Sequence, residues 1–294
     1  MRCACVDIGS NTTRLLVADC DAEGLREVEL TRVFTRIGSA LGADGVVPPS
    51  KIEELTRVVA ADVERARELG AERHAVVATA ALRDAVNSDE VLGAVAGACG
   101  TTVQLLSDEE EARLTFLGAA HTLAPPPEGS LAVVDVGGRS TEIALGSLAE
   151  GAGWARSFRI GSGLLADRHL QSDPPAPAQL EALRAHAREA LAGVRPPLAD
   201  RAVACGGSAG SLRRMAGDTL SRDSLEPVVA LLASAPAAVV AERFALDAER
   251  VRLLPAGVLI LAAVSDLLEM PLEVGNGGLR EGVLLELATQ GSMR

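Results

Sequence analysis

Two short segments of this chain share one pattern, in which an apolar strand ends in aspartate and a turn of small and polar residues follows at once. The first segment is VDIGSNTT at residues 6–13, and the second is VDVGGRST at residues 134–141. After each segment we predict two more strands and then alternating helices and strands, an order typical of α/β domains. The chain is therefore expected to fold as an internal duplication.

The first half is predicted to hold three consecutive strands before its first helix. A capping box of Ser50 and Glu53 should begin that helix, and Gly70 should end it. Further helices are predicted to begin at Ser88 and at Ser107. The predicted strands of this half lie at residues 3–8, about 13–18, about 27–35, 74–80 and 103–106.

The proline-rich stretch at residues 124–129 is the predicted boundary between the halves. We therefore expect a first domain at residues 1–123, a second at 124–278, and a C-terminal helix at 279–294 that packs back on the first domain. Helices should separate the later strands of the second half. Its predicted strands lie at about 131–136, 141–146, 154–160, 201–205, 251–254 and 272–274.

Composition narrows the classes of partner. The net charge is −12, aromatic residues make up 2% of the chain, and tyrosine is absent, so we expect no nucleic acid and no anionic membrane as partner. Lys51 is the only lysine, which leaves arginine to bind any polyanion. Arginine suits phosphate because its planar guanidinium donates two hydrogen bonds at once.

Other features point to an ordinary protein of the cytoplasm. Met1 leads directly into the first predicted strand, so we expect no targeting segment. The apolar run at residues 253–264 is too short for a membrane span and is predicted to be a buried helix. Five cysteines without a C-x-x-C pair indicate reduced core residues, not a disulfide framework or a zinc site.

The repeated turns have the chemistry of an anion site. Glycines let backbone N–H groups approach a phosphate, and hydroxyl and amide side chains add donors. Asp7 and Asp135 would then hold a divalent cation that neutralises the phosphate. The alternative for either segment alone is an ordinary hairpin with an Asx turn, but a matching pair at the start of two similar halves favours the anion site.

Five segments lie in order along the chain, namely VDIGSNTTRLLVA, ATAALRDAVN, SDEEEARLTFLGA, VVDVGGRSTEIAL and GLREGVLLEL. Together they resemble the exopolyphosphatase and guanosine-pentaphosphate phosphatase (Ppx/GppA) family, which belongs to the actin and hexokinase fold superfamily. The resemblance implies an α/β fold of two actin-like (RNase H-like) domains with a cleft between them. Longer members carry a further helical domain with a His-Asp motif, and no histidine here precedes aspartate, so the short form is expected.

The same resemblance assigns roles to residues that local patterns leave ambiguous. Glu111 precedes Ala-Arg-Leu, where the family has the acid that activates water; by itself the segment is only a helix start, with Ser107 and Glu110 as a capping box. Glu142 is implied to bind metal or orient water with Asp135, although a strand position also allows an exposed sheet residue. The implied phosphate ligands are Ser10, Asn11, Arg14, Arg83, Gly137, Gly138, Arg139 and Ser140.

The implied activity is Mg²⁺- or Mn²⁺-dependent removal of the terminal phosphate of inorganic polyphosphate by direct attack of water. The alternatives are hydrolysis of guanosine pentaphosphate and a non-catalytic sensor of phosphorylated guanosine nucleotides. Members of the family often form homodimers, so a homodimer is implied as well. The sequence does not decide between the two substrates.

Two details remain open at the level of sequence. Arg139 stands where the family usually has a third glycine, so a positive φ there would either strain the loop or force a different turn, whereas a negative φ would let the guanidinium add a phosphate contact. The segment GSGLLA at residues 161–166 fits a dinucleotide-binding pattern but lacks the surrounding βαβ unit. We predict a plain turn there.

Overall fold

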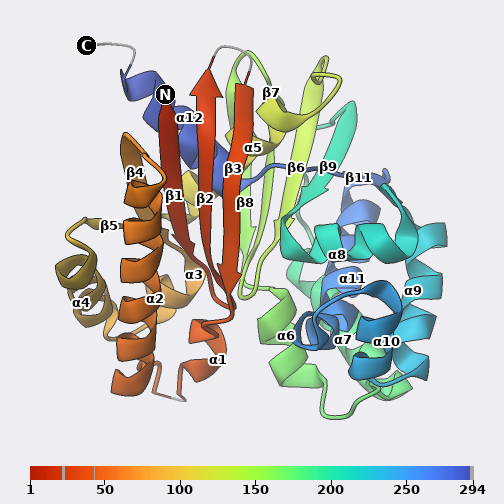
Figure 1. Cartoon of the computed structure of the whole chain (residues 1–294). Helices are drawn as coiled ribbons and strands as arrows, with labels where there is room; N and C mark the ends of the chain where they lie inside the picture. Colours follow the sequence, from red (N-terminus) through yellow and green to blue (C-terminus); the bar gives the residue numbers. More distant parts are fainter. Residues whose placement is uncertain (22–23, 43, 292–294) are drawn as a thin grey trace. The chain divides into compact units, whose positions relative to one another are not determined.

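The computed structural model describes residues 1–21, 24–42 and 44–291 (Figure 1). Its contacts divide the chain into two compact units. Unit 1 consists of Met1–Thr122 and Gly277–Arg294, and unit 2 consists of Leu123–Asn276. The end of the chain therefore returns to the unit in which the chain begins.

Unit 1 is built on a five-stranded mixed sheet with the order β3-β2-β1-β4-β5. Strands β1, β2 and β3 are antiparallel neighbours, whereas β4 and β5 run parallel to β1. The parallel strands place the ends of β1, β4 and β5 at one edge of the sheet. The strands are β1 (Arg2–Ile8), β2 (Thr13–Asp21), β3 (Gly24–Val33), β4 (Arg73–Ala78) and β5 (Val103–Leu105).

Successive residues of a strand point to opposite faces of the sheet, and here apolar residues point to both faces. Helices therefore cover both faces. One buried cluster joins Val6 and Val17 to α2 (Pro49–Glu68) and α4 (Ser88–Cys99). A second cluster joins Cys5 and Leu16 to α5 (Asp108–Thr122) and α12 (Leu279–Gly291). Two short helices, α1 (Ile37–Ala40) and α3 (Ala80–Asp84), follow β3 and β4.

Unit 2 repeats this arrangement in its six-stranded sheet, ordered β10-β11-β9-β6-β7-β8. From β8 to β11 the order and directions match those from β3 to β5, and β10 is added at the edge. The predicted α/β class and the internal duplication are confirmed. The strands are β6 (Ser130–Val136), β7 (Thr141–Ser147), β8 (Gly151–Phe158), β9 (Arg201–Cys205), β10 (Thr219–Leu220) and β11 (Leu272–Val274).

Helix α11 (Ala248–Leu268) is central to unit 2, where it packs against α6, α7, α8, α9 and α10. Its length and apolar composition would allow a membrane span, but 61% of its most apolar window is buried, as in the core helix of a globular domain. The predicted buried helix at residues 253–264 is confirmed. The others are α6 (Ser162–His169), α7 (Pro177–Ala190), α8 (Gly206–Ala216), α9 (Arg222–Ser234) and α10 (Ala237–Phe244).

Several local predictions are wrong. Residues 251–254 are helical because Asp247 caps α11 by accepting from two backbone N–H groups, so the apolar run continues as a helix. Helix α2 begins at Pro49 without a side-chain cap, so Ser50 and Glu53 form no capping box. Strand β4 ends at Ala78, two residues early, and strand β10 was not foreseen. The five cysteines are free, buried thiols, as predicted.

A buried carboxylate on α2 gives a test of the packing between α2 and the sheet. Burial raises the pKa of Asp62 to about 6, with Glu29 adding to the shift and a weak hydrogen bond from Thr31 opposing it. The unfolded chain releases this proton near its ordinary pKa of 3.8. The contribution of Asp62 to stability therefore falls as the pH rises from about 4 to about 6.

We predict that Asp62→Asn raises the melting temperature at pH 8, by about 2–4 °C, because it removes a buried charge. The gain should shrink at pH 5, where the folded protein holds Asp62 mostly protonated. Thermal unfolding at both pH values checks this, with Glu64→Gln on the exposed side of the same helix as control. An equal gain at pH 5 and pH 8 would show that the charge of Asp62 is not the cause.

Candidate active site

The first Asp-turn is closed by a backbone hydrogen bond. The N–H of Gly9 donates to the carbonyl of Thr12 at 3.1 Å, so the chain reverses within a few residues between β1 and β2. A Cβ at position 9 would lie only 3.0 Å from that carbonyl oxygen. The reversal makes Asp7 and Arg14 direct partners on neighbouring strands.

The second turn has the same construction. The N–H of Gly137 donates to the carbonyl of Ser140 at 3.0 Å, and Asp135 becomes the direct partner of Glu142. The equivalence extends to the threonine that begins each following strand, because Thr13 and Thr141 both bond through their hydroxyls to the segment after the third strand. The two loops are therefore structural repeats.

Each loop is braced by a second segment that the sequence analysis missed. In unit 1, Gly38 donates its N–H to the carbonyl of Ser10 at 2.7 Å, and Arg36 donates to Asn11 at 3.0 Å. In unit 2, Ser162 donates to Gly137 at 2.9 Å, and Leu164 donates to Gly138 at 2.9 Å. These bonds use N–H groups at the start of α1 and α6 to fix the loop carbonyls.

The prediction of a plain turn at residues 161–166 is therefore wrong. This segment begins α6 and holds the second loop by these backbone hydrogen bonds. A side chain at Gly161 would place its Cβ 2.3 Å from the backbone nitrogen of Arg139. Only glycine allows the two backbones to approach so closely. The glycines of this segment are the sequence signal that could have indicated this close backbone contact.

Burial raises the pKa of Asp7, and the charges of Arg280 and Arg14 partly oppose this effect. Its Oδ1 atom is buried and has no hydrogen-bond partner, which suits an atom that binds a cation or water. Arg280 lies in the GLREG segment at the start of α12, 14% of its side chain is exposed, and sequence analysis gave it no role. It belongs to the surroundings of Asp7.

In unit 2, Asp135 and Glu142 form a pair of carboxylates on one face of the sheet. Glu142 is 2% exposed and accepts a hydrogen bond at 2.8 Å from Ser157, its partner on β8. Gly206, with φ of +81°, begins α8 beside Asp135, and a Cβ there would lie 2.1 Å from the Asp135 Oδ1 atom. The positive end of the α8 dipole thus faces a carboxylate.

Two carboxylates on neighbouring strands fit a hard divalent cation, which often takes its other ligands from water and substrate phosphate. Within residues 1–21, 24–42 and 44–291, no three His, Cys, Asp or Glu side chains group as a complete metal site. The oxygen-only donors of Asp135 and Glu142 in unit 2, like that of Asp7 in unit 1, match Mg²⁺ or Mn²⁺ better than zinc.

Arg83 and Glu111 meet directly although 28 residues separate them in sequence. The Arg83 Nη1 atom donates to Glu111 Oε2 at 2.6 Å and to the Leu106 carbonyl at 2.9 Å, and Nη2 lies 2.5 Å from Asp108. Glu111 is largely buried in the first turn of α5, which Ser107 and Glu110 cap reciprocally as predicted. Arg83 therefore fixes the position of the Glu111 carboxylate.

Arg139 does not strain its loop. In the described part of the chain, the non-glycine residues with positive φ are Arg36, Ala245 and Glu269. The first alternative for Arg139, a strained loop, is therefore wrong. The positive charge of Arg139 also lowers the pKa of Asp167, although burial of that carboxyl has the larger and opposite effect.

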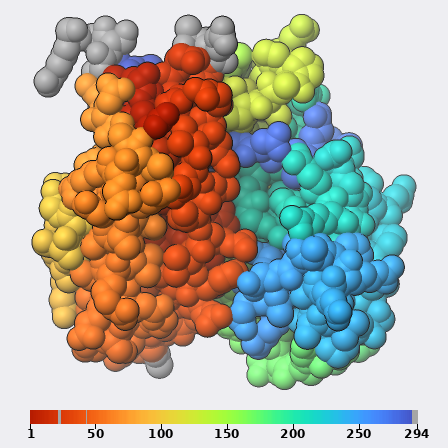
Figure 2. All heavy atoms as spheres, in the orientation of Figure 1, coloured from red at the N-terminus to blue at the C-terminus, as the bar shows by residue number. Residues whose placement is uncertain are grey.

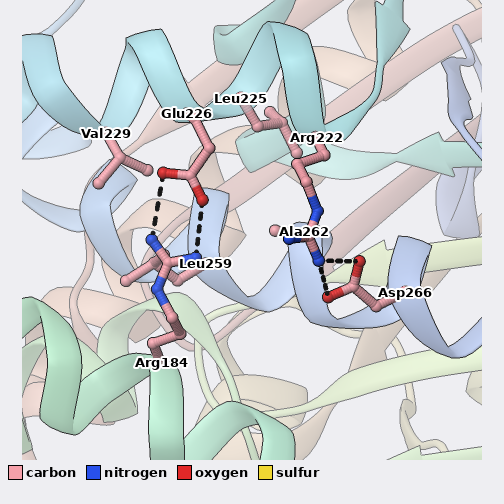
Figure 3. A pocket seen from close by; sticks show the side chains of 8 residues that line it. All are labelled: Arg184, Arg222, Leu225, Glu226, Val229, Leu259, Ala262 and Asp266. Atoms are coloured by element: carbon pink, nitrogen blue, oxygen red, sulfur yellow. Dashed lines mark hydrogen bonds and ion pairs between the residues drawn. The ribbon is translucent and has the colours of Figure 1, made fainter.

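A surface pocket of unit 2 offers arginines but is already occupied by their carboxylate partners (Figure 3). Arg184 binds Glu226 through two hydrogen bonds of 2.9 and 3.3 Å, and Arg222 binds Asp266 at 3.0 and 3.1 Å. These pairs join α7 to α9 and α9 to α11. These ion pairs connect the helices, and their carboxylates already occupy the arginines, so the pocket does not serve as a phosphate site.

The sequence-predicted residues therefore gather in groups within each unit. In unit 1, Asp7, Ser10, Asn11 and Arg14 share the first loop, while Arg83 and Glu111 form an ion pair beyond the ends of β4 and β5. In unit 2 the second loop and its flanks hold the remaining predicted residues, which are Asp135, Gly137, Gly138, Arg139, Ser140 and Glu142.

Comparison with known proteins agrees with this construction. A sequence model of the Ppx/GppA phosphatase family matches residues 16–290. Exopolyphosphatase 1 of Mycobacterium tuberculosis is 29% identical over 303 residues, which cover 97% of this chain and 88% of that protein. The crystal structure of the Aquifex aeolicus member of the Ppx/GppA family has a TM-score of 0.84 at 28% identity, covering 99% of this chain and 98% of that one.

A shorter alignment gives higher identity. Exopolyphosphatase 2 of M. tuberculosis is 37% identical over 202 residues, which cover 65% of this chain and 61% of that protein, so the match spans less than two thirds of this relative. The family match and these relatives indicate a phosphatase hydrolase. The chain belongs to the Ppx/GppA phosphatase family.

We predict that Gly161→Ala distorts the second loop, because its methyl group would collide with the Arg139 backbone. Activity should fall at least about tenfold, and the melting temperature should drop by several degrees, as for other strained or overpacked sites. Phosphate release and thermal unfolding measure both effects. The control is Gly210→Ala in α8, where nothing lies within 4 Å of the added Cβ and activity should be unchanged.

Proposed function

We propose that this protein is an exopolyphosphatase that removes the terminal phosphate of inorganic polyphosphate by direct attack of water. The observation that carries the proposal is the repeated loop, in which an aspartate and a closed Gly-containing turn stand at the same place in two duplicated sheets. The names of the relatives from M. tuberculosis support this choice of substrate. The net charge of −12 is compatible with it because arginines concentrate the positive charge locally.

In the proposed reaction, water attacks the terminal phosphorus while the bond from that phosphorus to its bridging oxygen breaks. Glu111 accepts a proton from the water, and the products are orthophosphate and a polyphosphate shortened by one unit. Arg83 holds the Glu111 carboxylate in one orientation. The first loop with Arg14 in unit 1 and the second loop in unit 2 each offer donors to phosphate oxygens, so positioning and charge neutralisation would supply most of the rate.

A divalent cation, Mg²⁺ or Mn²⁺, would neutralise phosphate charge when bound and is proposed as the cofactor. Asp135 and Glu142 are the candidate ligands in unit 2, and Asp7 is the candidate ligand in unit 1. Ser157 keeps Glu142 in place by its hydrogen bond. Adding a chelator should stop phosphate release, and Mg²⁺ or Mn²⁺ should restore it.

The alternatives from the sequence are separated by one assay. Phosphate release is measured side by side from long polyphosphate, tripolyphosphate and guanosine pentaphosphate, with metal and with chelator. Release only from guanosine pentaphosphate would reject the exopolyphosphatase proposal, and binding without any release would identify a sensor. The homodimer and the cytoplasmic location stay predictions.

We predict that Glu111→Gln lowers kcat by about 10²–10⁴-fold, as expected for loss of a general base. The amide keeps the shape of the side chain and a hydrogen bond with Arg83, so folding and polyphosphate binding should remain. Glu109→Gln, an exposed neighbour on the same helix, is the matched control and should retain full activity. If the Glu111 variant kept more than a tenth of wild-type activity, Glu111 would not be the base.

We predict that Arg139→Gly weakens binding of long polyphosphate, because it removes a guanidinium from the second loop. Since Arg139 lacks a positive φ, glycine relieves no strain, and stability should stay level or fall by up to about 1 kcal/mol. The measurements are KM and thermal unfolding, with Arg168→Gln on the exposed side of α6 as control. Faster hydrolysis by the glycine variant would instead show that Arg139 obstructs the loop.

A further inference from the structure

A row of charged residues crosses the sheet of unit 1 beside the first loop. Asp7 on β1 is the direct partner of Arg14 on β2, and Arg14 is the direct partner of Arg32 on β3. Direct partners in antiparallel strands point to the same face of a sheet, and neighbouring strands lie about 4.8 Å apart. The row therefore leads from the end of β1 to the edge strand in two steps.

The outer part of this row is strongly cationic. Arg14 and Arg32 are like charges in direct opposition, a pairing that destabilises a sheet. Arg36 follows two residues after Phe34, and the guanidinium carbons of Arg32 and Arg36 lie 5.0 and 5.9 Å from the centre of the Phe34 ring. Three arginines thus collect at the loop end of β2 and β3, where the Arg14 Nε atom also donates to the Thr12 hydroxyl at 3.1 Å.

Arg36 also has a backbone conformation that glycine adopts more easily than arginine. Its φ is 51°, in the left-handed region where glycine is preferred and a side chain costs backbone strain. Its N–H nevertheless holds the Asn11 carbonyl of the first loop. Strain of this kind is often retained at functional sites. Glycine would relieve the strain here, but it would also remove the guanidinium beside the loop.

The duplicated sheet shows that the fold does not require these charges. The equivalent row in unit 2 is Asp135 on β6, Glu142 on β7 and Ser157 on β8. The backbone positions are the same, but an acid replaces Arg14 and a serine replaces Arg32. The duplicated sheet therefore forms without arginines at these positions.

We propose that Arg32 and Arg36, which lie beyond Arg14 in this row, form a tail subsite that binds phosphate units farther from the chain end than tripolyphosphate reaches. The ligand is a linear polyanion with a charge on every unit, which meets successive arginines along the row. Arg32 and Arg36 are exposed, and the segment that contains β3 lies at the surface (Figures 1 and 2), so a long chain can continue into solvent. This inference rests on the proposed function and deepens it by selecting long polyphosphate.

The test compares substrates of different length with the double variant Arg32→Gln/Arg36→Gln. KM for long-chain polyphosphate should rise about tenfold, whereas KM for tripolyphosphate should change by less than about twofold, and kcat should be unchanged for both. The salt dependence of KM for the long substrate should also become weaker, because fewer charges contribute. Arg36→Gly alone should raise KM while the melting temperature stays level or rises.

Arg26→Gln is the matched control, because Arg26 is an exposed arginine at the other end of the same strand and pairs with Asp19. It removes the same charge and should leave KM for every substrate unchanged. An equal rise in KM for tripolyphosphate and long polyphosphate, or no rise for either, would overturn the tail subsite. Binding of labelled polyphosphate that depends on Arg32 without any phosphate release would instead reject the proposed function and retain the subsite.

Discussion

The closure of each Asp-turn by one backbone hydrogen bond determines the rest of the site. Because Gly9 and Gly137 donate to the carbonyl three residues ahead, each chain reversal has a fixed length and each following strand a fixed register. A register shifted by one residue would turn every side chain of the next strand to the opposite face. Arg14 and Glu142 face their aspartates only because the turns have this length.

The same closure leaves loop carbonyls that other segments must satisfy, since a buried backbone group without a partner is costly. The starts of α1 and α6 supply the donors, and the close approach at Gly161 follows from this requirement. These contacts explain what sequence analysis missed. A bond between two backbones depends on the fold and leaves only a weak trace in the side chains, namely a glycine where the chains meet.

The parts of the fold that sequence predicted well are those in which the apolar pattern and the capping signals agree. Strands β1, β2, β6 and β9 lie where expected, and the capping box of Ser107 and Glu110 forms. Prediction failed where two signals competed. Residues 251–254 are apolar enough for a strand, but the cap at Asp247 and the apolar run that follows make them the start of a core helix.

The site shows a similar limit. Local pattern and family resemblance named Arg83 and Glu111 separately, but their ion pair depends on how β4 and β5 bring α3 and α5 together. Arg280 comes from the far end of the chain, and only the return of α12 to unit 1 places its charge near Asp7. Residues brought together by tertiary structure could not be paired from a single sequence.

The two charged rows show how one scaffold accommodates opposite chemistry. A cross-strand pair changes stability by only about 0.2–1 kcal/mol, which is small beside the burial of a core that includes 35 buried apolar residues in unit 2. The sheet therefore tolerates Arg14 beside Arg32 as readily as Glu142 beside Ser157. Since the apolar cores set the backbone in both units, the charged side chains beside each loop are free to differ. The duplicated fold thus places two acids beside Ser157 in one unit and one acid beside two arginines in the other.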